Sequence, residues 1–274
     1  MKRRSKIAIG LAGALLAALA AGGAALASGR MHEGFAKQRV TRHIDAALDA
    51  VAANAAQRDA VHAARDHVFA TFEETHRGQR AEIDQALTLW QADRLDTVKL
   101  GELRAQHQAA AKKTGDAVVQ AITDAHDALT AAQRTKLADY LRAHRPPVDA
   151  KSVDGMKPFF KHMVNERVDD MLDQVSARAD QRDKVHAAVE RAFTAIAAGV
   201  GDHAAHFDEA IALFSADRID PAKVQALEGQ RQARMQQMGD AVMSALTDVH
   251  DTLDAGQRKT VADLIRKHHG RHGG

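Results

Sequence analysis

HDALTAAQRTKLADYLRAH at residues 126–144 and HDTLDAGQRKTVADLIRKH at residues 250–268 are two versions of one sequence, 124 residues apart. With this shift, positions 40–144 align with positions 164–268 without a gap, and roughly 45 of about 105 positions are identical. Helical segments that share only their composition do not stay in step over such a length. The sequence therefore predicts a tandem duplication, and the fold of one copy is expected to apply to the other.

Each copy is predicted to be helical from end to end. In the first copy, Val40, Ile44, Leu48 and Val51 have the spacing of one short amphipathic helix. A longer helix is expected from about residue 54 to residue 91, a second long one from 96 to 129, and a short one after 130. The predicted fold class is all-α, as two tandem copies of a four-helix unit built on a long helical hairpin.

Helix-start signals mark the boundaries between these segments. Asn54-Ala-Ala-Gln57 and Thr130-Ala-Ala-Gln133 are capping boxes, in which the cap oxygen and the glutamine bind free backbone N–H groups. Asp254 replaces the threonine in the second copy and is able to make the same cap. Asp96 is a predicted N-cap, and its counterpart is followed by Pro221, a residue favoured at the first helical position.

The sequence divides into five predicted regions. Residues 37–145 are the first helical repeat and residues 161–268 the second, and residues 269–274 form a His/Gly tail. Between the repeats, residues 146–160 contain Pro146, Pro147 and Pro158, which predict a semi-extended linker. Residues 1–27 are predicted to be a signal peptide.

The N-terminal segment gives the predicted location. A basic MKRRSK is followed by an apolar run that ends in Ala25-Leu26-Ala27, a pattern typical of a cleaved export signal. We expect a periplasmic protein cleaved near Ala27; the alternative is an inner-membrane protein anchored by this apolar segment. Removing residues 1–27 lowers Lys+Arg from 38 to 34 against 36 Asp+Glu, which gives a net charge of −2 and argues against nucleic-acid binding. The chain has no cysteine, so its stability must come from packing.

The Leu-Thr-x-x-Gln-Arg element at 129–134, with a second Gln-Arg element before it, resembles the LTxxQ pattern of the Spy/CpxP family, which includes zinc-resistance-associated and other heavy-metal-response proteins. The segment WQADRLDTVKLGELRAQ (90–106) is similar to the tip between the two long helices of that family. The first element of each copy, ANAAQR and ARADQR, lacks the Leu-Thr, and the fused duplication also departs from the family pattern. The resemblance assigns these residues to the family motif at the helix caps: Gln57, Arg58, Leu129, Thr130, Gln133, Arg134, Gln181, Arg182, Leu253, Asp254, Gln257 and Arg258.

The resemblance implies a periplasmic ATP-independent chaperone or envelope-stress-response protein that shields unfolded proteins on a helical surface; the alternative is a periplasmic heavy-metal-binding sensor or buffer. Family members are thin and all-helical, and often pair as antiparallel dimers; some are ATP-independent chaperones, and others restrain sensor kinases or bind zinc. By this resemblance the expected partners are unfolded or partly folded envelope proteins and the periplasmic domain of a sensor kinase. The two copies here are expected to form either an intramolecular version of the dimer or separate domains, and a homodimer is also open.

The sequence gives no sign of an enzyme. Cysteine is absent, no phosphate-binding glycine loop or nucleophile elbow occurs, and none of the six serines has a convincing histidine and carboxylate arrangement. No cofactor is expected to be required. Methionines at 163, 171, 235, 238 and 243 suit a surface that accommodates many clients, although core packing is the alternative use for each.

Histidine is unusually abundant, at 16 residues. His62 and His126 are about equally far in sequence from the hairpin tip, so an antiparallel hairpin places them at similar heights. Together with a carboxylate they form a candidate site for Zn²⁺ or another divalent transition metal, and the tail is a second candidate. The alternative is that these histidines bind neighbouring acids. The candidate metal ligands are His62, Asp66, His126, His186, Glu190, His250, His268, His269 and His272.

Overall fold

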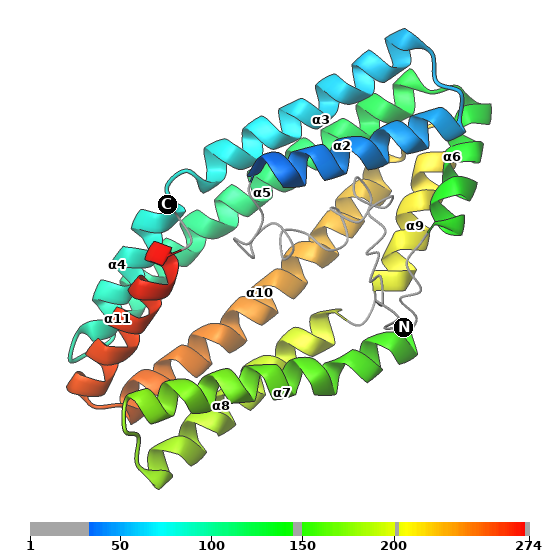
Figure 1. The fold of residues 1–274 in the computed structure, drawn as a ribbon. Coiled ribbons are helices and arrows are strands. Elements are labelled where there is room, and N and C mark those ends of the chain that lie inside the picture. Colours follow the sequence, from blue (N-terminus) through cyan, green and yellow to red (C-terminus); the bar gives the residue numbers. More distant parts are fainter. Residues whose placement is uncertain (1–32, 145–149, 201–202, 272–274) are drawn as a thin grey trace, which may run out of the picture. The chain divides into compact units, whose positions relative to one another are not determined.

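The computed structural model describes residues 33–144, 150–200 and 203–271 (Figure 1). The predicted signal peptide, with its cleavage site, lies outside these residues, as does His272. All regular structure in the described ranges is α-helical, which confirms the predicted all-α class. None of the helices in these ranges combines the length and the apolarity that crossing a bilayer requires.

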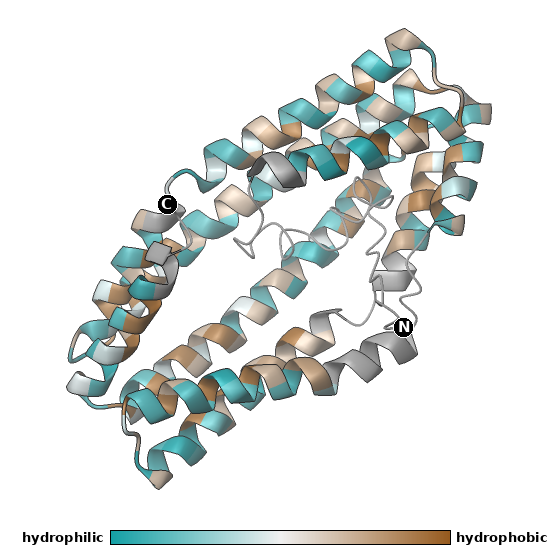
Figure 2. Ribbon diagram, viewed as in Figure 1, coloured by the Kyte–Doolittle hydropathy of each residue, from teal (hydrophilic) through white to brown (hydrophobic). Residues whose placement is uncertain are grey.

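The first copy begins with α2 (Glu33–Ala50) and α3 (Ala55–His76). It continues with α4 (Gln79–Gln91), the 32-residue α5 (Thr97–Ala128) and α6 (Ala131–Ala143). The second copy repeats this order with α7 (Ala150–Gln174), α8 (Ala179–Val200), α9 (His203–Ser215), α10 (Pro221–Thr252) and α11 (Ala255–Arg271). Most of these helices carry both hydrophilic and hydrophobic residues (Figure 2), as expected of helices that bury one side.

The predicted long helix over residues 54–91 is broken in two. It ends at His76 and starts again at Gln79, with Gly78 as the N-cap residue of α4 and no side-chain cap. Glycine costs about 1 kcal/mol relative to alanine inside a helix, so Gly78 weakens a helix at this position. In the second copy, α8 ends at Val200 and α9 begins at His203, on either side of two residues that the structure does not describe. The expected four-helix unit therefore has five helices in the described part of each copy.

The predicted linker also differs from the structure. Its first part lies outside the described residues, but residues 150–160 are helical, and Pro158 lies inside α7. A proline inside a helix removes one backbone hydrogen bond and clashes with the preceding turn, but neighbouring turns still hold the helix. The structure thus extends the helix at the start of the second copy by about three turns.

The chain forms two compact units, and each contains parts of both copies. Of the described residues, unit 1 contains 33–74, 111–144 and 203–221, and unit 2 contains 75–110, 150–200 and 222–271. In unit 1, α9 of the second copy packs against α6 of the first, and α2 also packs on α6. In unit 2, α4 of the first copy packs against α11 of the second, and α7 packs on α8. The boundaries of the sequence copies are therefore not those of the compact units.

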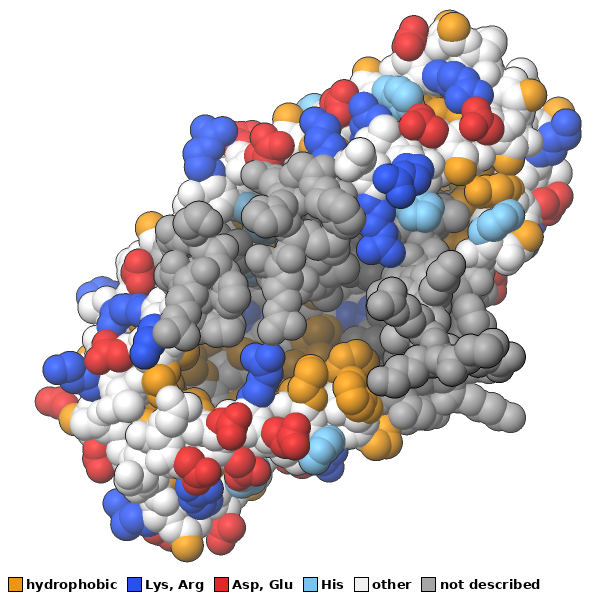
Figure 3. Space-filling model, in the orientation of Figure 1, with side chains coloured by type: hydrophobic (Ala, Val, Ile, Leu, Met, Phe, Trp, Pro, Cys, Tyr) orange, Lys and Arg blue, Asp and Glu red, His pale blue; other side chains and the backbone are white. Residues whose placement is uncertain are grey.

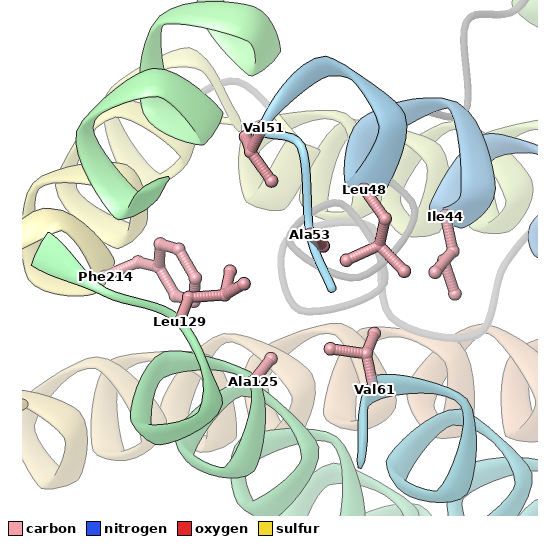
Figure 4. Packing of buried hydrophobic residues seen from close by; sticks show 8 residues of the cluster. All are labelled: Ile44, Leu48, Val51, Ala53, Val61, Ala125, Leu129 and Phe214. Atoms are coloured by element: carbon pink, nitrogen blue, oxygen red, sulfur yellow. The ribbon is translucent and has the colours of Figure 1, made fainter. Parts of the chain in front are cut away.

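The core of unit 1 shows this exchange directly. Phe214 of α9 lies against Leu129 at the end of α5, within a cluster that includes Leu48 and Val61 (Figure 4). Phe207 and Ile211 of α9 are buried in an adjoining cluster with side chains of α6. Burial of one such side chain contributes about 1.5–3 kcal/mol, so α9 is an integral part of this core.

Unit 2 has a corresponding core. Trp90 and Leu87 of α4 lie in one cluster with Leu172 of α7 and with Val261 and Ala262 of α11. Leu172 and Ala262 are fully buried. Trp90 of α4 and Phe214 of α9 thus each lie in a core with side chains of the other copy.

Candidate functional site

The family-motif glutamines join the two helix-start elements of each copy. In unit 1, Asn54 and Gln57 form a capping box, with Gln57 N donating to Asn54 Oδ1 at 2.9 Å and Asn54 N to Gln57 Oε1 at 3.0 Å. Thr130 and Gln133 form the second box, at the start of α6. The two glutamine carboxamides donate to each other, at 2.7 and 2.9 Å. This glutamine pair ties the start of α3 to the start of α6.

The same arrangement occurs in unit 2. Asp254 and Gln257 make the capping box predicted for the second copy, with distances of 3.0 and 2.9 Å. Gln181 accepts from the backbone N–H of Arg178 and exchanges amide hydrogen bonds with Gln257, at 2.8 and 3.1 Å. Gln181 also donates to the carbonyl oxygen of Thr252. Asp254, Gln257 and Gln181 thus bind free backbone groups at the starts of α11 and α8. The reciprocal pairing of the glutamines is a feature that spacing along the sequence did not reveal.

The motif arginines bind free carbonyl groups at helix ends. Arg134 donates to the carbonyl oxygen of Leu129 at 2.8 Å and to that of His126 at 3.3 Å. Arg258 donates to the carbonyl oxygen of Leu253 at 2.7 Å. A buried cation at a helix C-terminus is favoured by the helix dipole.

The preceding motif arginines, Arg58 and Arg182, do the same at the ends of α2 and α7. They donate to the carbonyl oxygens of Ala53 and Ala177. Arg58 also pairs with Asp49, and Arg182 with Asp173. The motif leucines, Leu129 and Leu253, are 3% and 2% exposed, so they fill the core beneath these caps. The motif as a whole builds the fold and presents no reactive group.

The structure does not bring the predicted metal ligands together. His62 binds Asp45 of α2 at 2.8 Å, whereas His126 is buried and binds the carbonyl oxygen of Ala216 at 2.9 Å through Nε2. Because a carbonyl oxygen only accepts, Nε2 of His126 is the donor. The other ring nitrogen lies 2.9 Å from Asp127 Oδ1. Both nitrogens of His126 are thus engaged in structural contacts.

The second copy repeats these contacts. His186 binds Asp169 at 2.9 Å, and His250 binds the carbonyl oxygen of Ala92 and the carboxylate of Asp251, both at 3.0 Å. Trp90 lies edge-on to the His250 ring, as Phe214 does to the ring of His126. His126 therefore holds the end of α9, and His250 holds the end of α4. Sequence reasoning missed this role because the two partners are 90 and 158 residues away.

The predicted carboxylate ligands are also paired with cations. Asp66 binds Arg65 and lies 3.5 Å from Lys37, and the hydrogen bond from Arg65 lowers the pKa of its carboxyl group. Glu190 binds Lys161 at 2.7 Å. Across the ranges that the structure describes, no group of three histidine or acidic side chains is arranged to hold a metal ion. His268 and His269 lie in α11, and their metal role stays a prediction.

Exposed apolar side chains mark a second candidate site. On α7, Phe159 is 64% exposed, Phe160 46% and Met163 36%, and the two phenylalanine rings contact edge to face. Hydrophobic side chains gather over this helix (Figure 3). We refer to Phe159, Phe160 and Met163 as the α7 patch. The two phenylalanines were missed because they fell in the predicted linker, although adjacent aromatics in a polar stretch are a usable signal.

Met235 and Val242 are also exposed, on α10. Two of the five methionines proposed for a client surface, Met163 and Met235, thus lie at the surface. Met171, in contrast, packs against the core of unit 2. The expectation for the methionines is therefore met only for some of them.

A comparison with known families matches residues 163–264, within the second copy, to the family described as LTXXQ motif family protein. No curated protein and no solved structure matches the chain. The matched segment contains Leu253, Asp254 and Gln257, so the match falls on the copy in which aspartate stands in place of the motif threonine. Residues 163–264 are therefore similar to the LTXXQ motif family.

Proposed function

We propose that this protein is an exported, ATP-independent chaperone of the envelope stress response, which shields unfolded proteins on its helical surface. The observation that carries the proposal is the α7 patch, two adjacent phenylalanines and a methionine held in solvent on a regular helix. Large aromatic side chains seldom stay exposed side by side unless they contact another molecule. Export is supported by the signal-like N-terminal sequence.

The surroundings of the patch suit a weak and general binding surface. Lys161 pairs with Glu190 at 2.7 Å, and His162 lies 3.3 Å from Glu166, so charged groups lie beside the apolar rings. Mixed charges keep such a surface soluble, whereas flexible and aromatic side chains accept apolar segments of many shapes. The patch offers contact area without a pocket for one defined ligand.

The test is suppression of client aggregation by the mature chain. A chemically denatured model client is diluted into buffer without nucleotide, and light scattering is followed with increasing amounts of chaperone. We expect the wild-type chain to suppress scattering, and the Phe159→Ser/Phe160→Ser variant to need several times more protein for the same effect. Circular dichroism should show unchanged helix content, because both side chains lie in solvent.

Val98→Ser is the matched control. Val98 is 72% exposed on α5, and the substitution likewise replaces an exposed apolar group with a hydroxyl. Suppression by this variant should equal that of the wild type. Equal suppression by the wild type and the double phenylalanine variant would reject the α7 patch as the client surface, and no suppression by the wild type would reject the chaperone function itself.

A further inference from the structure

The exchanged helices α4 and α9 occupy equivalent positions, and we call them the tip helices. Each packs on a base helix of the other copy, α4 on α11 and α9 on α6. We infer that the two helix pairs are matched in shape. The base helix α11, which carries Val261, fits the tip helix α4 with Trp90, and the base helix α6, which carries Leu137, fits the tip helix α9 with Phe214. Each base thereby selects the tip of the other copy over a tip like its own.

A tip cannot dock on the base of its own copy. The tip helix α4 precedes α5 by only a few residues, whereas the base residues, from His126 onward, follow at the other end of α5. A helix of 32 residues is about 48 Å long, so an intact α5 keeps a tip and its own base apart. The tip helix that packs on each base helix must therefore come from another copy. Which features make α11 bind α4, and α6 bind α9, is then decided by the contacts at the two positions.

The polar contacts at the two positions are shared and do not discriminate. Each tip ends in Ala-Asp-Arg, at 92–94 and 216–218. His250 and His126 each donate to the carbonyl oxygen of the alanine in these elements. Arg258 NH2 lies 3.6 Å from Asp93 Oδ1, and Arg134 NH2 lies 3.5 Å from the carbonyl oxygen of Asp217. A tip of either kind satisfies these groups.

The apolar contacts differ between the positions. In unit 2 the larger ring, Trp90, shares its cluster with the smaller Val261. In unit 1 the smaller ring, Phe214, lies in a cluster against which the larger Leu137 packs. The next residue of each base helix is alanine in both copies, Ala262 and Ala138, and both are at most 1% exposed. Compared with unit 1, unit 2 thus has a larger ring on the tip helix, Trp90 in place of Phe214, and a smaller residue on the base helix, Val261 in place of Leu137. The second change partly offsets the added volume of the first.

One directional contact adds to this match. The indole Nε1 of Trp90 donates to the carbonyl oxygen of Arg258 at 3.2 Å, in a buried position. Phenylalanine has no donor for such a bond. A tip helix with phenylalanine packed on α11 would leave this carbonyl oxygen without the indole donor and the space around Val261 unfilled. A tip helix with tryptophan packed on α6 would collide with neighbours arranged for the smaller ring.

The experiment is a double-mutant cycle in each unit of the full mature chain. Val261→Leu adds a methylene group on α11, within the cluster that contains Trp90, and should lower the melting temperature by about 2–10 °C. Trp90→Phe should lower the melting temperature much less when it is added to Val261→Leu than when it is made alone, because the smaller ring makes room for leucine. In unit 1, Phe214→Trp should be destabilising and should be partly rescued by Leu137→Val.

Val185→Leu is the control for overpacking in general. Val185 is 1% exposed and belongs to the same cluster as Trp90, but it lies on α8 and not on the base helix. Trp90→Phe should not rescue this variant. Additive effects in both cycles, or equal rescue of Val185→Leu and Val261→Leu, would overturn the matching. If Val261→Leu does not fold, the cycle of Leu137→Val and Phe214→Trp decides, because Leu137→Val only removes volume.

Discussion

Gln181 and Gln257, 76 positions apart, bind each other through both of their amide groups, and Gln181 is only 1% exposed. The pair joins the start of α8 to the start of α11 across the core of unit 2. A buried carboxamide is stable only where its donors and acceptors are satisfied. The amide of Gln181 also donates to the carbonyl oxygen of Thr252, and the amide of Gln257 accepts from Asp254 N and donates to the carbonyl oxygen of Val175. The family motif therefore places its polar side chains where loss of one leaves others unpaired.

Gln181→Ala should accordingly be strongly destabilising. The change removes the cap of Arg178 N and leaves the amide of Gln257 and the carbonyl oxygen of Thr252 without their partner. We expect a loss of about 2–4 kcal/mol in the free energy of unfolding, measured by urea denaturation. Gln174→Ala, at an exposed glutamine of α7, is the control and should change it by about 0.5 kcal/mol or less.

Glycine at two helix ends should stabilise the protein. Ala52 and Ser176, at corresponding positions after α2 and α7, both have a φ of 51°, in the left-handed region that disfavours residues with a side chain. Each follows a helix end in which Ala53 N donates to Leu48 O, or Ala177 N to Leu172 O. Ala52→Gly or Ser176→Gly should raise the free energy of unfolding by about 0.5–1 kcal/mol.

The control for these glycine variants is a glycine substitution in an ordinary helix turn. Ala56 is exposed in the first turn of α3, so Ala56→Gly should be destabilising. The melting temperature should therefore rise in Ala52→Gly and in Ser176→Gly and fall in Ala56→Gly. A decrease in stability for both Ala52→Gly and Ser176→Gly would show that the strain at these positions is not relieved.

The cap at Asp96 should depend on pH. Lys99 N donates to Asp96 Oδ1 at 3.0 Å, and this bond lowers the pKa of Asp96 below its ordinary value of 3.8. The stabilisation is therefore fully present above the pKa of the unfolded state and is lost as the pH falls through the lower pKa of the folded state. Asp96→Asn keeps a capping oxygen but does not titrate.

The measurement is a series of urea melts of the wild type and Asp96→Asn between pH 2 and pH 7. The difference in urea midpoint between the two proteins should be constant above about pH 5 and should shift in favour of the asparagine variant in acid. Asp96→Ala should be less stable than both at neutral pH. A wild-type to asparagine difference that is the same at every pH would contradict the role of the carboxylate.

Zinc uptake, if it occurs, should depend on the tail histidines. His126 and His250 are committed to carbonyl groups of the tip helices, whereas His268, His269 and His272 lie within five positions of one another. Titration calorimetry of a chain that ends at Lys267 should show loss of zinc uptake relative to the full chain. The His62→Ala/His186→Ala variant should bind as the wild type does, and retention of zinc by the shortened chain would refute the tail as the site.

The sequence by itself determined the helical class, the helix starts that a capping box marks and the correspondence between residues 124 positions apart. These features are local: a capping box spans four residues, and an amphipathic pattern repeats with every turn of a helix. Thr130 with Gln133 and Asp254 with Gln257 form the predicted capping boxes, because the partners that satisfy them are three residues away. The family segment was likewise recognisable from local order and spacing.

Only the tertiary structure decided which helix completes which core. The spacing of Ile83, Leu87 and Trp90 predicts an apolar face but not its partner, since hydrophobic burial has no direction. The helix is interrupted at Gly78 and α5 is 32 residues long, and in the structure this face packs on the second copy. There His250 and Arg258 bind the segment that follows α4. For the same reason His126 and His250, which the sequence offered as metal ligands, are instead buried and donate to carbonyl groups far away along the chain.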